Sequence, residues 1–185
     1  MDMEWYQSNP RLQEAEIEAM NKLYPDAKWG YSSNGRMYWT IIIHPVIFGE
    51  EKEWVLLAVY EFYHPHKGAS VRVYPVKPNY NEMMKMIEIS SVTPKDRIPN
   101  IFRDYSDLCI LDTLSFCDEE DKKNKCKVIK TAAYHIRLAI RWITIFEVGL
   151  VEQKVWSVFS GTGYGNKYKY ICNHFSYIPE INHLQ

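Results

Sequence analysis

The sequence predicts an α+β fold in which an N-terminal helix precedes an antiparallel four-stranded meander and C-terminal helices follow. Three observations support this prediction. Apolar residues recur at helical spacing near the start of the chain, strand-like runs separated by turn residues come next, and a long helical pattern begins near residue 127. This order of elements is typical of folds in which helices pack on an antiparallel sheet.

The first helix is predicted to begin after Asn9 and to end before Pro25. Asn9 is a favoured N-cap because its side chain accepts a backbone hydrogen bond, and Pro10 suits the first helical position because its φ angle is already helical. The apolar face is assigned to Leu12, Ala15, Ala19, Met20 and Leu23, and the other faces to Glu14, Glu16 and Glu18. The helix is therefore expected to be amphipathic.

Four strands are predicted after this helix. Asn34-Gly35 indicates a hairpin, because both residue types adopt the positive φ angles of a tight turn. The predicted strands are Trp29–Tyr31, Met37–Ile43, Trp54–Tyr63 and a fourth strand with alternating valines at 71, 73 and 76. A charged turn at 49–53 separates the second strand from the third, and the segment 64–68 ends the third. The strands follow one another along the chain, which predicts a meander.

The second half of the chain has a different character. Residues 79–108 are interpreted as an irregular crossing that carries the site, and 118–127 as a charged loop. A helix is predicted from Lys127 to Val148, with Gly149 as its C-cap, and a further short element from Val151 to Phe159. A basic stripe on the long helix, interpreted as a solvated face, consists of Lys127, Lys130, Arg137 and Arg141 with Tyr134.

Composition sets limits on domain organisation and on partners. A chain of 185 residues with 46% apolar and 24% charged residues is typical of one globular domain, assigned to 1–160, with a glycine hinge and aromatic tail at 161–185 packed on the same domain. A net charge of −1 argues against attraction to nucleic acid or to an anionic membrane. The aromatic content of 15% instead favours a protein-binding surface.

Cysteine usage and the start of the chain predict a location. The four cysteines lack disulfide or zinc spacing, which indicates free thiols in a reducing cytoplasm. The acidic N-terminus has no apolar signal core, and no apolar run is long enough to span a membrane. We therefore expect a cytoplasmic protein with no cofactor and no metal. The oligomeric state stays open, with a homodimer among the alternatives.

The segment from Ile98 to Leu114 carries the residues from which a chemistry can be argued. Asn100 follows Pro99, and Cys109 stands nine positions after Asn100 at the start of a short apolar run. A thiolate is a nucleophile, and an amide side chain can donate a hydrogen bond to a developing oxyanion. The spacing makes Cys109 the candidate nucleophile and Asn100 either an oxyanion donor or a brace of the surrounding loop.

This segment resembles the active-site segment of ubiquitin-conjugating enzymes, in which His-Pro-Asn precedes a cysteine within Ile-Cys-Leu-Asp. Pro99 and Asn100 occupy the Pro-Asn positions, and Ile98 replaces the histidine. The other matching positions are Ile101, Phe102, Asp104, Leu108, Cys109, Asp112 and Leu114. This chain has one extra residue between the asparagine and the cysteine, and another after the cysteine. Residues 63–65, Tyr-His-Pro, resemble the family's Tyr-Pro segment with one residue inserted.

The resemblance implies a ubiquitin-conjugating-like fold and a transferase that forms a thioester at Cys109. The thiolate would accept the C-terminal acyl group of a partner protein, and a lysine amine of a target would then attack it. Asp112 is the candidate for orienting that amine, followed by Asp118 and Glu119, with solvated loop carboxylates as the alternative. The divergent motif resembles the bacterial branch found in antiphage defence operons, in which the partner is a cyclic-nucleotide synthase.

Two other functions stay open on the sequence alone. One is a non-catalytic interaction domain of the same fold in which Cys109 is structural, and the other is a cysteine hydrolase. Cys117 and Cys126 are interpreted as bystanders, with Cys117 as the reserve nucleophile, and Cys172 in the aromatic tail as a packing residue. No metal spacing joins the histidines, and His64-Pro65-His66 is interpreted as a surface turn. His135 lies on the long helix, and its spacing does not fix its distance from the site.

Overall fold

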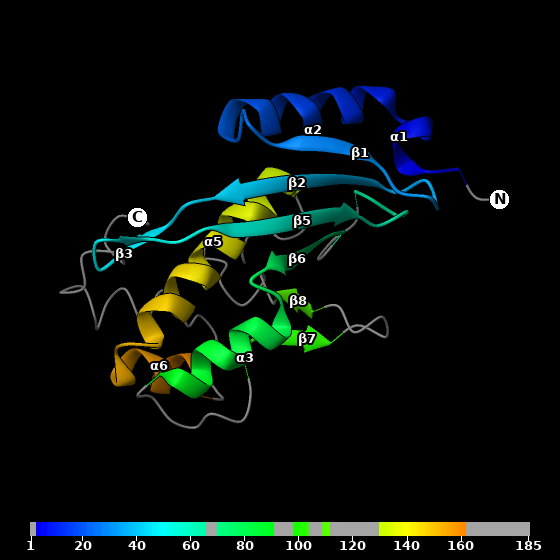
Figure 1. Ribbon diagram of the computed structural model, residues 1–185. Helices are drawn as coiled ribbons and strands as arrows, with labels where there is room; N and C mark the ends of the chain where they lie inside the picture. Colours follow the sequence, from blue (N-terminus) through cyan, green and yellow to red (C-terminus); the bar gives the residue numbers. More distant parts are fainter. Residues whose placement is uncertain (1–2, 66–69, 91–97, 104–108, 112–129, 162–185) are drawn as a thin grey trace.

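The computed structural model describes residues 3–65, 70–90, 98–103, 109–111 and 130–161. It has N-terminal helices, a four-stranded antiparallel sheet and C-terminal helices (Figure 1), so the predicted α+β class is confirmed. The helices are α1 (Trp5–Ser8), α2 (Pro10–Leu23), α3 (Tyr80–Ile89), α5 (Ala132–Gly149) and α6 (Gln153–Ser160). The strands are β1 (Lys28–Tyr31), β2 (Met37–Ile43), β3 (Val46–Ile47), β4 (Glu50–Glu51), β5 (Trp54–Tyr60), β6 (Val71–Lys77), β7 (Ile101–Arg103) and β8 (Cys109–Leu111).

The main sheet is a meander that covers α5 on one side. Its strand order is β1-β2-β5-β6, and each neighbouring pair is antiparallel. Alternate residues of the two central strands are buried on one face, namely Met37, Trp39 and Ile41 of β2 and Trp54, Leu56, Ala58 and Tyr60 of β5. The Trp54 ring meets the rings of Trp142 and Phe146 edge to face, which places α5 against this face. The core therefore lies between the sheet and α5.

The N-terminal helix agrees with the prediction at both ends. Asn9 caps α2, because its side-chain oxygen accepts the Leu12 N–H at 3.2 Å, and Pro10 is the first helical residue. The position of Glu16 was predicted wrongly. Glu16 lies on the buried face and is fully enclosed, because it is one helical turn before Met20 and shares its side of the helix. The short helix α1 was not predicted.

The strands also follow the prediction, with two corrections. Gly35 has a φ of 86°, as the turn between β1 and β2 requires. The third predicted strand, β5, ends at Tyr60 rather than Tyr63, because the His64 N–H donates to the Glu61 carbonyl (3.0 Å) and closes a turn there. His64 is buried, so the interpretation of His64-Pro65-His66 as a surface turn is wrong for its first residue. The charged turn at 49–53 includes β4, which pairs with β3.

The irregular crossing predicted for 79–108 is wrong in two places. Residues 80–89 form α3, and its capping box is complete: the Asn79 side chain accepts the Glu82 N–H at 3.1 Å and the Glu82 side chain accepts the Asn79 N–H at 2.7 Å. Residues 101–103 and 109–111 form the β7–β8 hairpin. Strands of three residues are too short for alternation to identify them in the sequence.

The long C-terminal helix is the most buried element. α5 begins at Ala132, after a Thr131 N-cap, rather than at Lys127, which lies outside the described residues. The prediction of a solvated basic stripe is wrong for Arg141, which is only 8% exposed, whereas Arg137 is exposed and lies with Lys130 over the Tyr134 ring. The C-cap is Leu150 rather than the predicted Gly149. Gly149 is the last helical residue and is packed closely, because a Cβ there would lie 3.1 Å from the Trp156 ring of α6. In the part of the chain that is described, no helix has the length and apolar character that crossing a membrane requires.

Candidate active site

The candidate nucleophile lies at the first position of β8, in the antiparallel β7–β8 hairpin. Cys109 is paired with Arg103, and Leu111 is paired with Ile101. β8 also packs against β6, the edge strand of the main sheet. β8 therefore packs against both β7 and the edge of the main sheet. The Arg103–Cys109 pair is at one end of the β7–β8 ladder, and the Ile101–Leu111 pair is at the other end.

The other end of the hairpin is attached to two helices. Ile98 and Leu111 belong to the hydrophobic core. The Trp142 indole N–H of α5 donates to the Pro99 carbonyl at 3.2 Å. The Asn100 side-chain amide donates to the Phe159 carbonyl of α6 at 3.0 Å. Two consecutive residues thus join the hairpin to the helices: Pro99 accepts a hydrogen bond from α5, and Asn100 donates one to α6. The buried side chains of Ile98 and Leu111 pack the same end of the hairpin into the core.

Asn100 has a backbone conformation that explains its residue type. Its φ is 53°, in the left-handed region that asparagine tolerates better than most residues. It immediately precedes β7 and lies next to Ile101, at the end of the ladder opposite to the Arg103–Cys109 pair, which is roughly 7 Å of strand from the Ile101–Leu111 pair. The contact observed for Asn100 is therefore that of a loop brace, and its role as an oxyanion donor stays a prediction.

The remaining predicted site residues are not placed. Asp112 lies outside the described residues, and so do the reserve nucleophile and the other candidates, namely Cys117, Asp118, Glu119, Cys126 and Cys172. Of the four cysteines, Cys109 alone has a described backbone. The candidate site is therefore defined by Cys109 and by the residues that anchor its hairpin.

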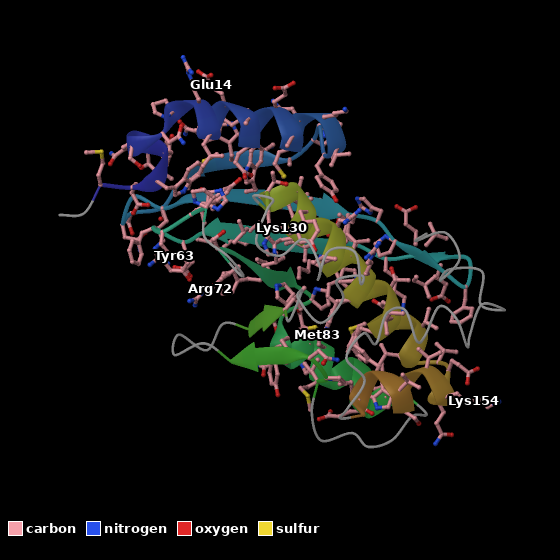
Figure 2. All side chains as sticks on the ribbon, turned by 180° about the vertical axis from the view of Figure 1, so that it is seen from behind. Glu14, Tyr63, Arg72, Met83, Lys130 and Lys154 are labelled. Atoms are coloured by element: carbon pink, nitrogen blue, oxygen red, sulfur yellow. The ribbon has the colours of Figure 1, made fainter. Side chains whose placement is uncertain are left out.

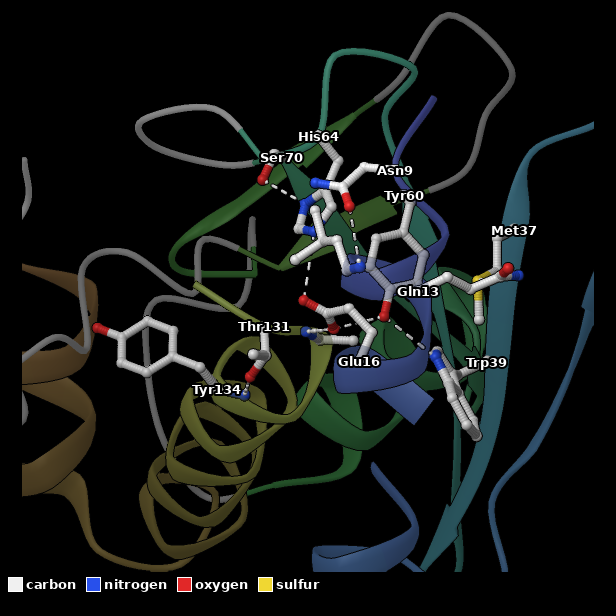
Figure 3. A network of polar contacts seen from close by, with 12 residues as sticks. Asn9, Gln13, Glu16, Met37, Trp39, Tyr60, His64, Ser70, Thr131 and Tyr134 are labelled. Carbon is white, nitrogen blue, oxygen red and sulfur yellow. Dashed lines mark hydrogen bonds and ion pairs between the residues drawn. The ribbon is translucent and has the colours of Figure 1, made fainter. Parts of the chain in front are cut away.

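A buried polar network lies at the junction of α2, β5 and α5 (Figure 3). The Glu16 carboxylate accepts the Tyr60 hydroxyl at 2.6 Å and the Ala132 N–H at 2.9 Å. Ala132 is the first residue of α5, so the negative charge also faces the positive end of the helix dipole. Burial and the neighbouring Glu16 raise the pKa of Tyr60 well above its ordinary value, so Tyr60 stays a neutral donor. Neither Glu16 nor this network was recognised as a site in the sequence.

The same network contains a histidine between a serine and the glutamate. His64 Nδ1 lies 2.9 Å from Ser70 Oγ, and His64 Nε2 lies 3.2 Å from Glu16 Oε1, an ion-pair distance without hydrogen-bond alignment. Serine, histidine and carboxylate in this order occur in hydrolase triads. All three residues are buried, and the His64 ring is packed against Trp5 and Tyr60. The arrangement therefore connects elements of the core rather than exposing a nucleophile.

His135 is neutral at physiological pH. Its side chain is fully buried in the first turns of α5, and its ring contacts the Tyr134 ring edge to face. Burial, followed by the charges of His64 and Lys130, lowers the pKa of His135 from 6.5 to about 4. A role for His135 at Cys109 stays untested.

The described residues offer no obvious metal site. No group of three or more histidine, cysteine, aspartate or glutamate side chains in the described ranges is arranged to hold a metal ion. Another buried carboxylate, Glu147 of α5, accepts hydrogen bonds from the Trp54 indole at 2.9 Å and from Lys52 at 3.0 Å. Protein groups thus contact both oxygens of Glu147, which is the arrangement of a structural ion pair.

Comparisons of the chain with protein-family models, curated proteins and solved structures found no match. A functional proposal for this protein therefore depends on its own residues and on the geometry of the hairpin.

Proposed function

We propose that this protein is a cysteine-dependent acyltransferase with a ubiquitin-conjugating-like fold and that Cys109 forms its thioester. The observation that carries the proposal is the anchored hairpin: Cys109 opens β8, while Pro99 and Asn100 hold the hairpin to α5 and α6. A nucleophile on a fixed backbone is suited to transfer chemistry, because positioning supplies much of the rate. The N-terminal helix, the four-stranded meander and the C-terminal helices also support the proposed fold, whereas α3, between the meander and the hairpin, is an addition to the expected order.

The proposed reaction has two steps. The Cys109 thiolate attacks the C-terminal carbonyl carbon of a partner protein that is carried as a thioester on an activating enzyme. The new sulfur–carbon bond forms as the old one breaks, and the activating enzyme's thiolate leaves. A lysine amine of the target then attacks the Cys109 thioester, forms an amide and releases the thiol, while the amine proton passes to a base. Asp112 is proposed to orient the amine.

The proposed partners follow from this chemistry. The donor is a protein with an activated C-terminal carboxyl, for which a bacterial cyclic-nucleotide synthase is our candidate. The acceptor is a protein with an accessible lysine. The biological setting we propose is bacterial antiphage defence in the cytoplasm, and it depends entirely on the resemblance of the 98–114 segment to ubiquitin-conjugating enzymes.

A second candidate is a non-catalytic interaction domain of the same fold. Cys109 lies between Leu108 and Ile110 in the sequence, and a cysteine within such an apolar run is most often a small packing residue rather than a nucleophile. The two functions differ in one measurable property, which is the reactivity of the Cys109 thiol at neutral pH.

The test is to trap the acyl group. Wild-type protein is incubated with an activated donor, and its mass is measured with and without a thiol reductant. We expect a reductant-sensitive adduct in the wild type, an oxyester or no adduct in Cys109→Ser, and adduct levels near wild type in Cys117→Ser and Cys126→Ser. Unchanged adduct in Cys109→Ser would refute the assignment. Discharge by water at the same rate with and without an amine would instead indicate a hydrolase.

A further inference from the structure

The strand β1 forms one edge of the main sheet, and its far side has no strand partner. The sheet order begins with β1, and among the described residues no backbone hydrogen bond reaches β1 from an element other than β2. Lys28, Trp29 and Tyr31 of this strand are exposed. An open edge of this kind is a template on which another extended segment can pair.

The register of β1 shows which backbone groups point to the open edge. The Ser32 N–H donates to the Arg36 carbonyl at 2.9 Å, and in an antiparallel ladder such hydrogen-bonded pairs alternate with pairs that are not bonded to each other. Tyr31 and Trp29, one and three positions before Ser32, therefore belong to the second kind. Their N–H and C=O groups point away from β2, so both residues offer a donor and an acceptor to an added strand.

The side chains of the same two residues form an aromatic surface beside the open edge. Trp29 is 43% exposed and Tyr31 is 47% exposed, and their rings meet edge to face at 5.7 Å. The Gln13 side chain of α2 donates to the Tyr31 hydroxyl at 2.6 Å. Ile17 lies one helical turn after Gln13 and is half-buried, so it is on the same side of α2. Aromatic and aliphatic groups are thus available to the side chains of an added strand.

Lys28 gives the open edge a positive charge. Its side chain is exposed and forms no ion pair with another residue in the described part of the chain. Lys28 precedes Trp29, so the two side chains are on opposite faces of the strand. Opposite charges on directly paired residues stabilise a sheet. An acidic residue opposite Lys28 would therefore complement the edge.

The position of α2 distinguishes a peptide from a second copy of the chain as the occupant. In Figures 1 and 2, α2 lies on the side of β1 that is away from β2. Two copies that pair antiparallel through β1 are related by a two-fold axis perpendicular to the joint sheet, so both copies of α2 would project into the same space. An extended peptide brings no helix with it. The arrangement therefore favours a peptide.

We propose that β1 binds an extended segment of a partner protein as an additional antiparallel strand. The residues of this segment opposite Trp29 and Tyr31 are apolar, because directly paired residues share a face of the sheet. The residue opposite Lys28 is acidic. In this mode of recognition, main-chain hydrogen bonds supply affinity and alternate side chains supply specificity. β8 packs against β6 at the other edge of the sheet, so the bound segment leaves the candidate active site open.

The test is an NMR titration of the full-length chain with synthetic nine-residue peptides. The parent peptide alternates valine with threonine, and an aspartate replaces the threonine nearest its C-terminus. We expect its largest effects on the amide signals of Trp29 and Tyr31, whose N–H groups face the open edge. Absent binding at millimolar peptide would overturn the inference, as would largest effects outside residues 28–31.

Two N-methylated peptides test the main-chain hydrogen bonds in the wild-type protein. In one peptide the valines are N-methylated, and in the other the threonines and the aspartate are. The valines are expected opposite Trp29 and Tyr31, so their N–H groups donate to β1, whereas the alternate N–H groups face away. The first peptide should bind roughly tenfold or more weakly than the parent, and the second should bind within severalfold of it. Equal binding of the two methylated peptides would overturn the inference.

Variants of Trp29 locate the binding at β1. Trp29→Val keeps the N–H group that faces the open edge, whereas Trp29→Pro removes it. Proline is tolerated on edge strands where its nitrogen faces solvent, so both variants are expected to fold. Trp29→Pro should bind the parent peptide roughly tenfold or more weakly than Trp29→Val. Equal affinities of two folded variants would contradict the inference, and the methylated peptides test it without any change to the protein.

A change of one peptide residue tests the role of Lys28. The wild type should bind the aspartate peptide severalfold more tightly than an asparagine analogue, and Lys28→Gln should bind both alike. Lys154→Gln is the control, because Lys154 is an exposed lysine of α6. It lies at the end of the molecule opposite to Glu14 of α2 (Figure 2). A preference for aspartate that persists in Lys28→Gln would refute the assignment of an acidic residue.

Amide hydrogen exchange of the free protein identifies any other occupant. We expect fast exchange at Trp29 and Tyr31 at every protein concentration. Protection that increases with concentration would indicate a second copy, and protection at all concentrations would indicate a segment of the same chain; either result would overturn the inference. These assays do not use the Cys109 thiol. An inert Cys109 with intact peptide binding would therefore overturn only the proposed function.

Discussion

Burial of His135 should make the free energy of unfolding depend on pH in the mildly acidic range. The pKa of His135 is lowered to about 4 in the folded protein, against 6.5 for an exposed histidine. As the pH falls below 6.5, the unfolded chain takes up a proton that the folded protein excludes. The stabilisation is therefore fully present above pH 6.5 and is lost progressively as the pH falls towards 4.

The size of this effect follows from the two pKa values. One pKa unit corresponds to about 1.4 kcal/mol, so full loss amounts to about 3 kcal/mol of unfolding free energy. Domains of this size have total stabilities of about 5–15 kcal/mol, so the loss is large enough to measure in a denaturant titration. His135→Gln keeps a neutral polar side chain that does not titrate, and this part of the pH dependence should disappear.

The assay is urea unfolding followed by tryptophan fluorescence at several pH values between 7.5 and 4. We expect the wild type to lose about 3 kcal/mol more than His135→Gln over this range, because acid effects of other groups occur in both proteins. His44→Gln is the control, since the His44 side chain is 49% exposed and is paired with Glu51 at the surface. Equal pH slopes for the wild type and His135→Gln would contradict this prediction, as would an NMR pKa for His135 near 6.5 in the folded state.

Two further predictions concern buried hydrogen bonds. Glu16→Gln should lower the unfolding free energy by about 2 kcal/mol, because the amide replaces the charge that faces the N-terminus of α5. Glu14→Gln on the exposed side of the same helix should change it little, and equal effects would exclude a special role for the network. Asn100→Gly keeps the left-handed backbone but loses the bond to Phe159, so it should destabilise by about 1 kcal/mol, and Asn100→Ala by about 1 kcal/mol more. Wild-type stability in Asn100→Gly would show that the brace contributes nothing.

Activity measurements on the same Asn100 variants address its second predicted role. If Asn100 is an oxyanion donor, Asn100→Ala should slow transfer to an amine by roughly 10²-fold while thioester formation persists. A brace alone should affect both steps together, in proportion to the loss of stability.

Elements with local signals could be predicted from the amino-acid sequence alone. The Asn9-Pro10 cap, the Asn34-Gly35 turn and the apolar periodicity of α2 and α5 predicted their elements, because caps, turns and amphipathic faces depend on residues within a few positions of one another. The Asn79 and Glu82 pair is equally local, so α3 could have been predicted and was overlooked. The candidate nucleophile and Asn100 were also chosen from local spacing.

The buried polar residues and the attachments of the hairpin, by contrast, depend on contacts between elements that are far apart in the sequence. Glu16 is separated by 116 residues from Ala132, whose N–H it accepts, and Asn100 by 59 residues from Phe159. No local sequence pattern predicts a hydrogen-bond partner at such a distance along the chain. A charged side chain on an apolar face is buried only where distant elements supply its hydrogen bonds and compensate for lost hydration. The identity of the buried groups therefore depends on how the helices and the sheet pack together.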